Sequence, residues 1–270
     1  MFNGSRIIII TIAAFFLFTS CQFGDRSKDK NVITIAGSTS VMPFTEKLAE
    51  HFMVDHKDFS IDVQGGGSTA GIQATFNNTV AIGMSSRSLK DDEKLLNTIT
   101  ICYDGISIIV HRNNPISEMS LEQVRHIFSG RISNWKQLGW IDRKIDAVSR
   151  EEGSGTRGAF EKLVMDDQEI DDGTMVQDSN GSVRQVVATD PYAIGYISMG
   201  LVDNKVTALT IDDVPPSIGA IKTGRYKIVR PFLYVTNGEL EEHEKEFVDY
   251  VLSRAGQTIL KNEGLVGFYD

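Results

Sequence analysis

Residues 149–160 read Ser-Arg-Glu-Glu-Gly-Ser-Gly-Thr-Arg-Gly-Ala-Phe, and this stretch indicates how the rest of the chain is built. It follows the apolar run 145–148, which predicts a short buried strand, and it leads into 159–165, whose apolar spacing predicts a helix. A glycine-containing turn between a strand and a helix leaves backbone N–H groups unpaired at the positive end of the helix. Such a turn is a ready site for an anion.

Side chains of the same stretch add donors that suit an oxyanion. Ser154 and Thr156 carry hydroxyls, and Arg150 carries a rigid, permanently charged guanidinium. One such turn fits an ordinary loop with a helix cap equally well. However, the chain repeats the pattern with Gly-Ser-Thr-Ser at 37–40 and Gly-Gly-Gly-Ser-Thr at 65–69. Three similar turns favour an anion site that is built from several loops.

The first third of the chain repeats a strand, a turn and a helix. The order predicts an α/β fold with a largely parallel sheet, in which ligands bind beyond the carboxyl ends of the strands. The predicted strands are 32–36, 59–63 and 80–84, and each precedes a predicted helix, at 41–56, 70–76 and 90–95.

Two long strand-like segments, 101–111 and 228–235, flank the middle of the chain and predict two crossings between two domains. A molecule with two lobes and two hinge strands can close on a ligand in the cleft. Between and after the crossings we expect helices at 120–128, 182–188 and 239–252 and a strand at 193–198. The predicted division is domain I from 32–107 and 231–270, and domain II from 108–230.

The N-terminus has the layout of a secretory signal. Arg6 precedes the apolar run 7–18, which is short for a membrane-spanning helix, and Thr-Ser-Cys follows, ending at Cys21. This layout resembles a bacterial lipoprotein cleavage site. The resemblance implies that 1–20 is removed, that Cys21 is lipidated, and that 21–31 is a lipidated N-terminus and tether. An uncleaved anchor, or an ordinary signal with a chance cysteine, is the alternative.

The composition excludes some classes of function. With 41% hydrophobic and 23% charged residues the chain is ordinary for a globular protein, and a net charge of −9 with a pI near 5.1 argues against a nucleic-acid surface. After lipidation Cys102 is the remaining thiol, and we expect it to be a buried small hydrophobe. No metal site is expected, because the histidines lack metal-ligand spacing: His51, His56, His111, His126 and His243.

Several motifs together resemble the phosphate-binding component of the bacterial phosphate ABC transporter, an extracytoplasmic solute-binding protein of the periplasmic-binding-protein class. The motifs are Ala-Gly-Ser-Thr-Ser at 36–40, Gly-Gly-Ser at 66–68, Ile-Gly-Met-Ser-Ser-Arg at 82–87, Asp-Gly-Ile at 104–106, Ile-Phe-Ser-Gly at 127–130, Ile-Ser-Asn-Trp at 132–135 and Arg-Glu-Glu-Gly-Ser-Gly-Thr at 150–156.

The resemblance implies a type II periplasmic-binding-protein-like fold, with two α/β domains joined by two hinge strands. It also implies a binding protein without enzymatic activity or cofactor, which captures inorganic phosphate in the cleft and delivers it to an ABC transporter. The implied partners are phosphate, the permease subunits and, through the lipid at Cys21, the membrane. The protein is then an exported monomer, anchored on the periplasmic or outer face of a cell-envelope membrane.

The resemblance further implies the residues that hold phosphate, which are Ser38, Thr39, Ser40, Ser68, Ser86, Arg150, Ser154, Gly155 and Thr156. The family often has an aspartate, which accepts the proton of phosphate, where this chain has Ser86. A hydroxyl accepts that hydrogen bond but can also donate one, so it excludes sulfate less firmly. We expect Glu151 to supply the missing acceptor and Glu152 to pair with Arg150.

Three other functions fit parts of the sequence. The segment 65–70 matches the dinucleotide fingerprint G-x-G-x-x-A, although an exported protein does not meet a nicotinamide pool. S-x-x-K at 133–136 and K-T-G at 222–224 occur in exported penicillin-recognising serine enzymes, but the S-D-N element is absent. A sensor or scaffold for phosphate or another oxyanion, without transport, is the third possibility.

Overall fold

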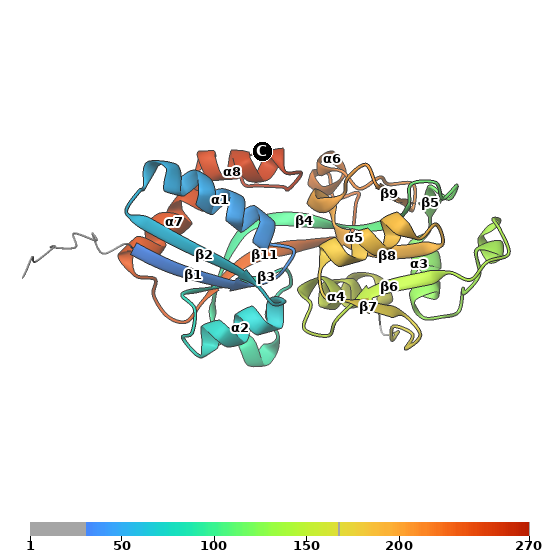
Figure 1. Cartoon of the computed structure of the whole chain (residues 1–270), viewed down its shortest axis with the longest axis horizontal. Coiled ribbons are helices and arrows are strands. Elements are labelled where there is room, and N and C mark those ends of the chain that lie inside the picture. Colours follow the sequence, from blue (N-terminus) through green and yellow to red (C-terminus); the bar gives the residue numbers. More distant parts are fainter. Residues whose placement is uncertain (1–30, 167, 270) are drawn as a thin grey trace, which may run out of the picture.

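The computed structural model describes residues 31–166 and 168–269. Figure 1 shows two α/β lobes side by side, with two long strands, β4 (Asn97–His111) and β11 (Val229–Thr236), running between them. The predicted signal, the lipidation site Cys21 and the tether lie outside the described residues, except that Asn31 begins β1. In the part of the chain that the structure describes, no helix is both long and apolar enough to span a membrane.

Lobe I contains the beginning and the end of the described chain. Its elements are β1 (Asn31–Gly37), α1 (Met42–Asp55), β2 (Phe59–Gly65), α2 (Ser68–Phe76), β3 (Ile82–Ser85), a 3-10 turn (Asp91–Glu93), α7 (Glu242–Leu252) and α8 (Arg254–Asn262). Its core holds Ile33, Phe44 and Phe232, with Cys102 buried among them as predicted.

Lobe II is made from the middle of the chain. Its elements are β5 (Glu118–Met119), α3 (Leu121–Phe128), a 3-10 turn (Trp135–Leu138), β6 (Asp146–Arg150), α4 (Gly155–Phe160), a π-helical turn (Glu161–Met165), β7 (Met175–Gln177), α5 (Asn180–Thr189), β8 (Ala193–Ser198), a 3-10 turn (Met199–Leu201), β9 (Val206–Ala208), β10 (Thr210–Ile211) and α6 (Ile218–Lys222). The aromatic rings of Phe128, Phe160 and Tyr196 pack together in its core.

The main sheet is mixed, with the order β2-β1-β3-β11-β4-β8-β6-β7 and with β9 beside β4. The outer strands of each lobe pair in parallel, as expected from the strand-turn-helix repeats. The expectation of a largely parallel sheet is wrong for the middle, where β11 pairs antiparallel with β3 and β4, and β4 with β8. The physical reason is that β4 carries the chain out of lobe I and β11 carries it back beside β4.

Two separate hydrophobic cores flank the crossing strands. The core of lobe I takes its buried members from 33–102 and 232–265, and the main core of lobe II takes its own from 106–228. The cores lie close to the division expected from the sequence, which we keep as a proposal: domain I from 32–107 and 231–270, and domain II from 108–230. Ile106, at the end of the first part of domain I, packs in the core of lobe II. A proline at position 231 is tolerated inside β11, close to a register shift between Phe232 and Leu233.

Several element ends differ from those predicted. The helix expected from 159 begins at Gly155, because the Ser154 hydroxyl accepts a hydrogen bond from Arg157 N–H and caps it. The segment expected to be helical at 90–95 is only a 3-10 turn. The strand expected from 101 begins at Asn97, and α8 was not predicted at all.

Candidate anion-binding site

Three turns of lobe I meet beyond the carboxyl ends of β1, β2 and β3, which are neighbouring parallel strands. The Ser38 hydroxyl donates to the Ser86 hydroxyl at 2.9 Å, and Ser86 Oγ lies 3.4 Å from Ser68 Oγ. The backbone N–H of Ser86 also donates to Ser68 Oγ at 3.1 Å. All three side chains are buried, so lobe I offers a compact group of hydroxyls at the junction of the lobes.

The turn at 150–156 of lobe II closes onto these hydroxyls. A Cβ atom on Gly155 would overlap Ser68 Oγ and would lie 2.6 Å from Ser86 Oγ, so only glycine allows this approach. Thr156 Oγ1 lies 2.7 Å from Ser40 Oγ, and both side chains are buried. The two lobes are therefore in contact across the predicted site.

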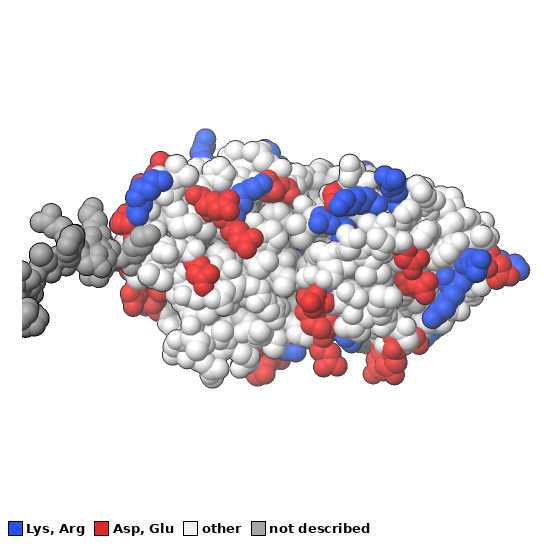
Figure 2. Space-filling view, in the orientation of Figure 1, with Lys and Arg blue, Asp and Glu red and all other residues white. Residues whose placement is uncertain are grey.

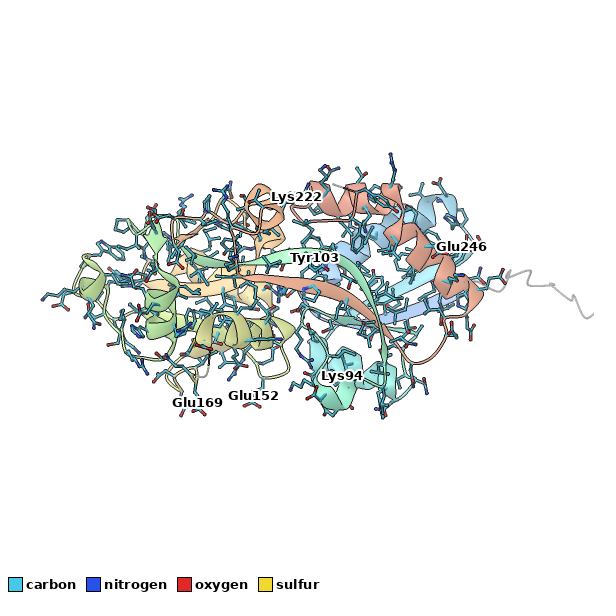
Figure 3. All side chains as sticks on the ribbon, turned by 180° about the vertical axis from the view of Figure 1, so that it is seen from behind. Lys94, Tyr103, Glu152, Glu169, Lys222 and Glu246 are labelled. Carbon is cyan, nitrogen blue, oxygen red and sulfur yellow. The ribbon has the colours of Figure 1, made fainter. Side chains whose placement is uncertain are left out.

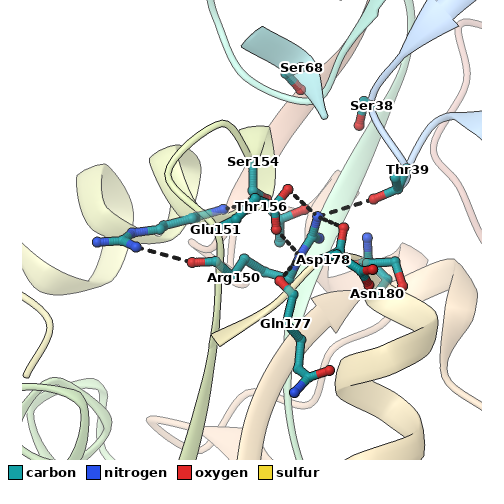
Figure 4. A network of polar contacts seen from close by, with 12 residues as sticks. Ser38, Thr39, Ser68, Arg150, Glu151, Ser154, Thr156, Gln177, Asp178 and Asn180 are labelled. Atoms are coloured by element: carbon teal, nitrogen blue, oxygen red, sulfur yellow. Dashed lines mark hydrogen bonds and ion pairs between the residues drawn. The ribbon is translucent and has the colours of Figure 1, made fainter. Parts of the chain in front are cut away.

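Arg150 lies at the centre of the contacts in Figure 4 and is 1% exposed. Its Nε and Nη2 donate to the Glu151 carboxylate at 3.0 and 2.9 Å, and to the backbone oxygens of Gln177 and Asp178 at 3.2 and 3.0 Å. Its Nη2 also donates across the lobes to Thr39 Oγ1 at 3.1 Å. Among the described residues, no atom accepts a hydrogen bond from Nη1. A buried charged donor without a partner is costly, so Nη1 is a donor that an oxygen of a bound ligand would satisfy.

The predicted pairing of Arg150 with Glu152 is wrong. The partner is Glu151, whose two oxygens bind the guanidinium, whereas Glu152 is exposed and lies at the rim of the lobe in Figure 3. Consecutive residues of a turn project in different directions, and the sequence does not indicate which of the two faces the arginine. Because Glu151 is engaged in this way, the structure gives no support to its expected role as an acceptor for the proton of phosphate.

Asn180 also belongs to this group of residues, although sequence reasoning missed it. Its Nδ2 donates to Ser40 Oγ at 2.8 Å, and its Oδ1 accepts from the backbone N–H of Ser198 at 3.0 Å. Asn180 is buried and begins α5 directly after β7, so it stands in a further strand-turn-helix unit. The sequence does place Asn180 in a turn before a predicted helix. Because that helix was expected to begin at 182, Asn180 was not recognised as its first residue.

Two arginines besides Arg150 are buried beside the site, and each is paired with a carboxylate. Arg87 donates to both oxygens of Glu93 at 2.7 and 2.8 Å and to Thr69 Oγ1 at 3.3 Å. The hydrogen bonds from Arg87 hold the pKa of the Glu93 carboxyl below its usual range. The other pair joins Arg230 to Asp104 at 2.9 Å. The site is therefore rich in directional donors, while most of its positive charge is locally balanced.

The face of the molecule that Figure 2 shows does not resemble a polyelectrolyte-binding surface. In Figure 2 acidic and basic side chains are interspersed over both lobes, and neither sign covers a continuous area of this face. Within residues 31–166 and 168–269, no group of three or more histidine, cysteine or acidic side chains could hold a metal ion.

The motifs of the alternative functions have other roles in the structure. Ser133 and Lys136 lie on an exposed part of lobe II, and the Lys136 ammonium pairs with Asp142 at 3.2 Å. The glycine-rich segment 65–70 forms one of the site turns, and Thr69 N–H donates to the Gly153 carbonyl of lobe II at 3.1 Å. The S-x-x-K lysine is therefore paired with a carboxylate at the surface, and the glycine-rich turn is engaged in a contact between the lobes.

Comparison with known proteins gives concordant matches. Residues 24–255 match the model of the PBP superfamily domain. The chain is 33% identical to the phosphate-binding protein PstS of Bacillus subtilis, over 100% of this chain and 96% of the relative. A solved substrate-binding protein of a putative phosphate ABC transporter from Clostridium perfringens, with bound phosphate, is 41% identical, with a TM-score of 0.86 over 88% of this chain and 100% of that one. An ABC-type phosphate transport receptor from Vibrio cholerae is 35% identical, with a TM-score of 0.72 over 87% of this chain and 99% of that one.

Proposed function

Because the chain belongs to the PBP superfamily and, within it, to the family of PstS phosphate-binding proteins, we propose that it captures inorganic phosphate between its lobes and delivers it to an ABC transporter. One observation carries the proposal. Among the described residues, Nη1 of buried Arg150 has no hydrogen-bond acceptor, and Arg150 lies among buried hydroxyls from both lobes. A small tetrahedral oxyanion offers acceptors in several directions at once and suits such a group of donors.

The proposed ligand-binding residues are those that the sequence indicated: Ser38, Thr39, Ser40, Ser68, Ser86, Arg150, Ser154, Gly155 and Thr156. Micromolar affinity corresponds to about 8 kcal/mol, and a hydrogen bond to a charged group contributes roughly 1.5 to 3 kcal/mol. Four or five such bonds suffice after the cost of ordering the site, and a single turn does not supply that number. The contacts between turns of both lobes support a site that is completed by closure.

We also propose that the protein acts without turnover, as a monomer exported and anchored by a lipid at Cys21. The curated and solved relatives are named as binding proteins, which supports the absence of catalysis. Transport rather than sensing is supported by the relatives named as components of phosphate ABC transporters. If cells that lack the protein take up phosphate at the normal rate but fail to respond to phosphate shortage, the sensor function is the better one.

Equilibrium dialysis with radiolabelled phosphate tests the ligand. We expect saturable binding of one phosphate per chain, recovered chemically unchanged when the protein is denatured. The same measurement on Arg150→Ala, described in the Discussion, ties the binding to this site. Absence of saturable binding by the intact mature protein would overturn the proposed function.

The residue at position 86 sets how firmly sulfate is excluded. We expect Ser86→Asp to bind phosphate but to lower the ability of sulfate to compete by about tenfold or more, because a carboxylate accepts the proton of phosphate and repels the proton-free sulfate. The Ser38 hydroxyl, which donates to Ser86 Oγ, can donate to the new carboxylate. The measurement is phosphate binding at increasing sulfate. Ser133→Asp, on the exposed part of lobe II, is the control, and equal sulfate competition in wild type and Ser86→Asp would contradict the prediction.

A further inference from the structure

A buried ion pair joins the two strands that cross between the lobes, which run side by side in Figure 3. Arg230 on β11 stands opposite Asp104 on β4 in the antiparallel ladder, so both side chains project from the same face of the sheet. Arg230 Nε and Nη2 donate to Asp104 Oδ2 at 3.0 and 2.9 Å, and the two side chains are 1% and 0% exposed.

Stability alone does not explain why charged residues occupy this place. Burial raises the pKa of the Asp104 carboxyl and lowers the pKa of the Arg230 guanidinium, while each partner favours the charged form of the other. Removing two charges from water is so costly that neutral residues of similar volume often give equal or greater stability. A buried pair at a crossing point is therefore better explained by what its remaining polar atoms hold in position.

Those remaining atoms reach into both lobes. Asp104 Oδ1 accepts a hydrogen bond from Ser198 Oγ at 2.8 Å, at the end of β8 in lobe II. Arg230 Nη1 donates to the backbone oxygen of Ser86 at 3.4 Å, in the turn that follows β3 in lobe I. The pair thus connects lobe II to one of the hydroxyl-bearing turns of the anion site.

A second branch returns from lobe II to another turn of the site. The backbone N–H of Ser198 donates to Asn180, whose Nδ2 donates to Ser40 Oγ, and Ser40 Oγ lies 2.7 Å from Thr156 Oγ1. The hydrogen bonds therefore run without a gap from Ser86, through Arg230, Asp104, Ser198 and Asn180, to Ser40 and Thr156. Both ends of this network lie in the anion site, and its middle lies at the crossing.

We propose that Asp104 and Arg230 are positioning residues of the phosphate site, which hold the Ser86 turn of lobe I against Ser198 and Asn180 of lobe II when the lobes are closed. The inference rests on the proposed function, because it assumes that phosphate is the ligand. Asp104 has a distinct part, since its carboxylate balances the buried charge of Arg230, whose pKa is lowered by burial and also by the nearby positive charge of Arg150. Arg230 then holds the Ser86 carbonyl, and Asp104 holds the end of β8.

Rapid-mixing kinetics of phosphate binding to the mature protein test the inference, together with the melting temperature without ligand. We expect Arg230→Gln and Asp104→Asn to release phosphate about tenfold faster or more, because the closed state loses hydrogen bonds that hold the two lobes together around the site. The association rate is expected to change little, since encounter takes place with the lobes apart. The double variant removes both charges and should regain ligand-free stability, while its phosphate release stays fast.

Tyr226→Phe is the matched control. The Tyr226 hydroxyl donates to the Ile106 backbone oxygen of β4 at 2.6 Å, so this variant also removes a buried hydrogen bond at the crossing, outside the network. We expect a lower melting temperature with unchanged phosphate release. The inference is wrong if Arg230→Gln also lowers the melting temperature without changing phosphate release. It is equally wrong if the double variant regains slow release together with stability. In both cases the proposed function stands. Failure of the wild type to bind phosphate would instead remove the proposed function.

Discussion

Replacement of Arg150 by alanine is expected to weaken phosphate binding by about a hundredfold to a thousandfold. The change removes the buried donor Nη1, which has no partner among the described residues, and it leaves the carboxylate of Glu151 without its cation beside the bound anion. Loss of a hydrogen bond to a charged group accounts for about one to two factors of ten, and the unpaired carboxylate adds repulsion. The measurement is equilibrium dialysis or calorimetry with phosphate, with the melting temperature of the ligand-free variant as a second readout.

Arg184→Ala provides a control on the same lobe. Arg184 lies on α5, is about one third exposed, and bonds the Leu201 carbonyl and Asp203 at 2.8 and 3.5 Å. The Arg184→Ala variant is expected to bind phosphate with wild-type affinity. Arg150→Lys should fall between wild type and alanine, because an ammonium keeps the charge but cannot make the same forked contacts. Wild-type affinity in Arg150→Ala would exclude this residue from the ligand site.

The general plan of the molecule was predictable because it depends on local patterns. Glycine-rich turns between strand-like and helix-like runs mark the carboxyl ends of strands, so the turns that hold Ser38, Ser68 and Ser154 were expected near one another. In the structure Ser38 and Ser68 both contact Ser86, and Gly155, next to Ser154, lies against Ser68. The two crossing strands were also visible, as long apolar runs on either side of the central block. Each of these signals lies within a few residues of the position that it predicts.

Contacts between distant segments were not predictable in the same way. Asn180 joins Ser40 across 140 positions, and Arg230 joins Asp104 across 126, so neither pair leaves a local pattern. The prediction of the partner of Arg150 failed for a related reason, because the choice between Glu151 and Glu152 depends on which carboxylate the turn directs inward. The antiparallel middle of the sheet follows from the return of β11 beside β4, which the spacing of strand-like runs does not encode.

Replacement of Gly155 by alanine is expected to reduce phosphate affinity by about a hundredfold or more while leaving the ligand-free protein folded. The new Cβ would overlap Ser68 Oγ, and it would lie 2.6 Å from Ser86 Oγ and 2.9 Å from Ser68 Cβ. Rotation of the Ser68 hydroxyl relieves the first contact only, because the Cβ of Ser68 is fixed to the backbone. Gly155 has no positive φ and begins α4, where alanine is a good helix former, so the strain arises only when the lobes meet.

Small-angle X-ray scattering separates this cause from a loss of folding. Phosphate is expected to make the wild-type protein more compact, whereas Gly155→Ala should keep the larger radius of gyration at the same phosphate concentration, with an unchanged circular dichroism spectrum. Gly219→Ala on α6 is the matched control, because a Cβ at Gly219 has no heavy atom within 4 Å among the described residues. It should bind phosphate normally and be slightly more stable. Tight binding and full compaction in Gly155→Ala would mean that the two lobes do not need this close approach, and a phosphate site formed by their closure would then be untenable.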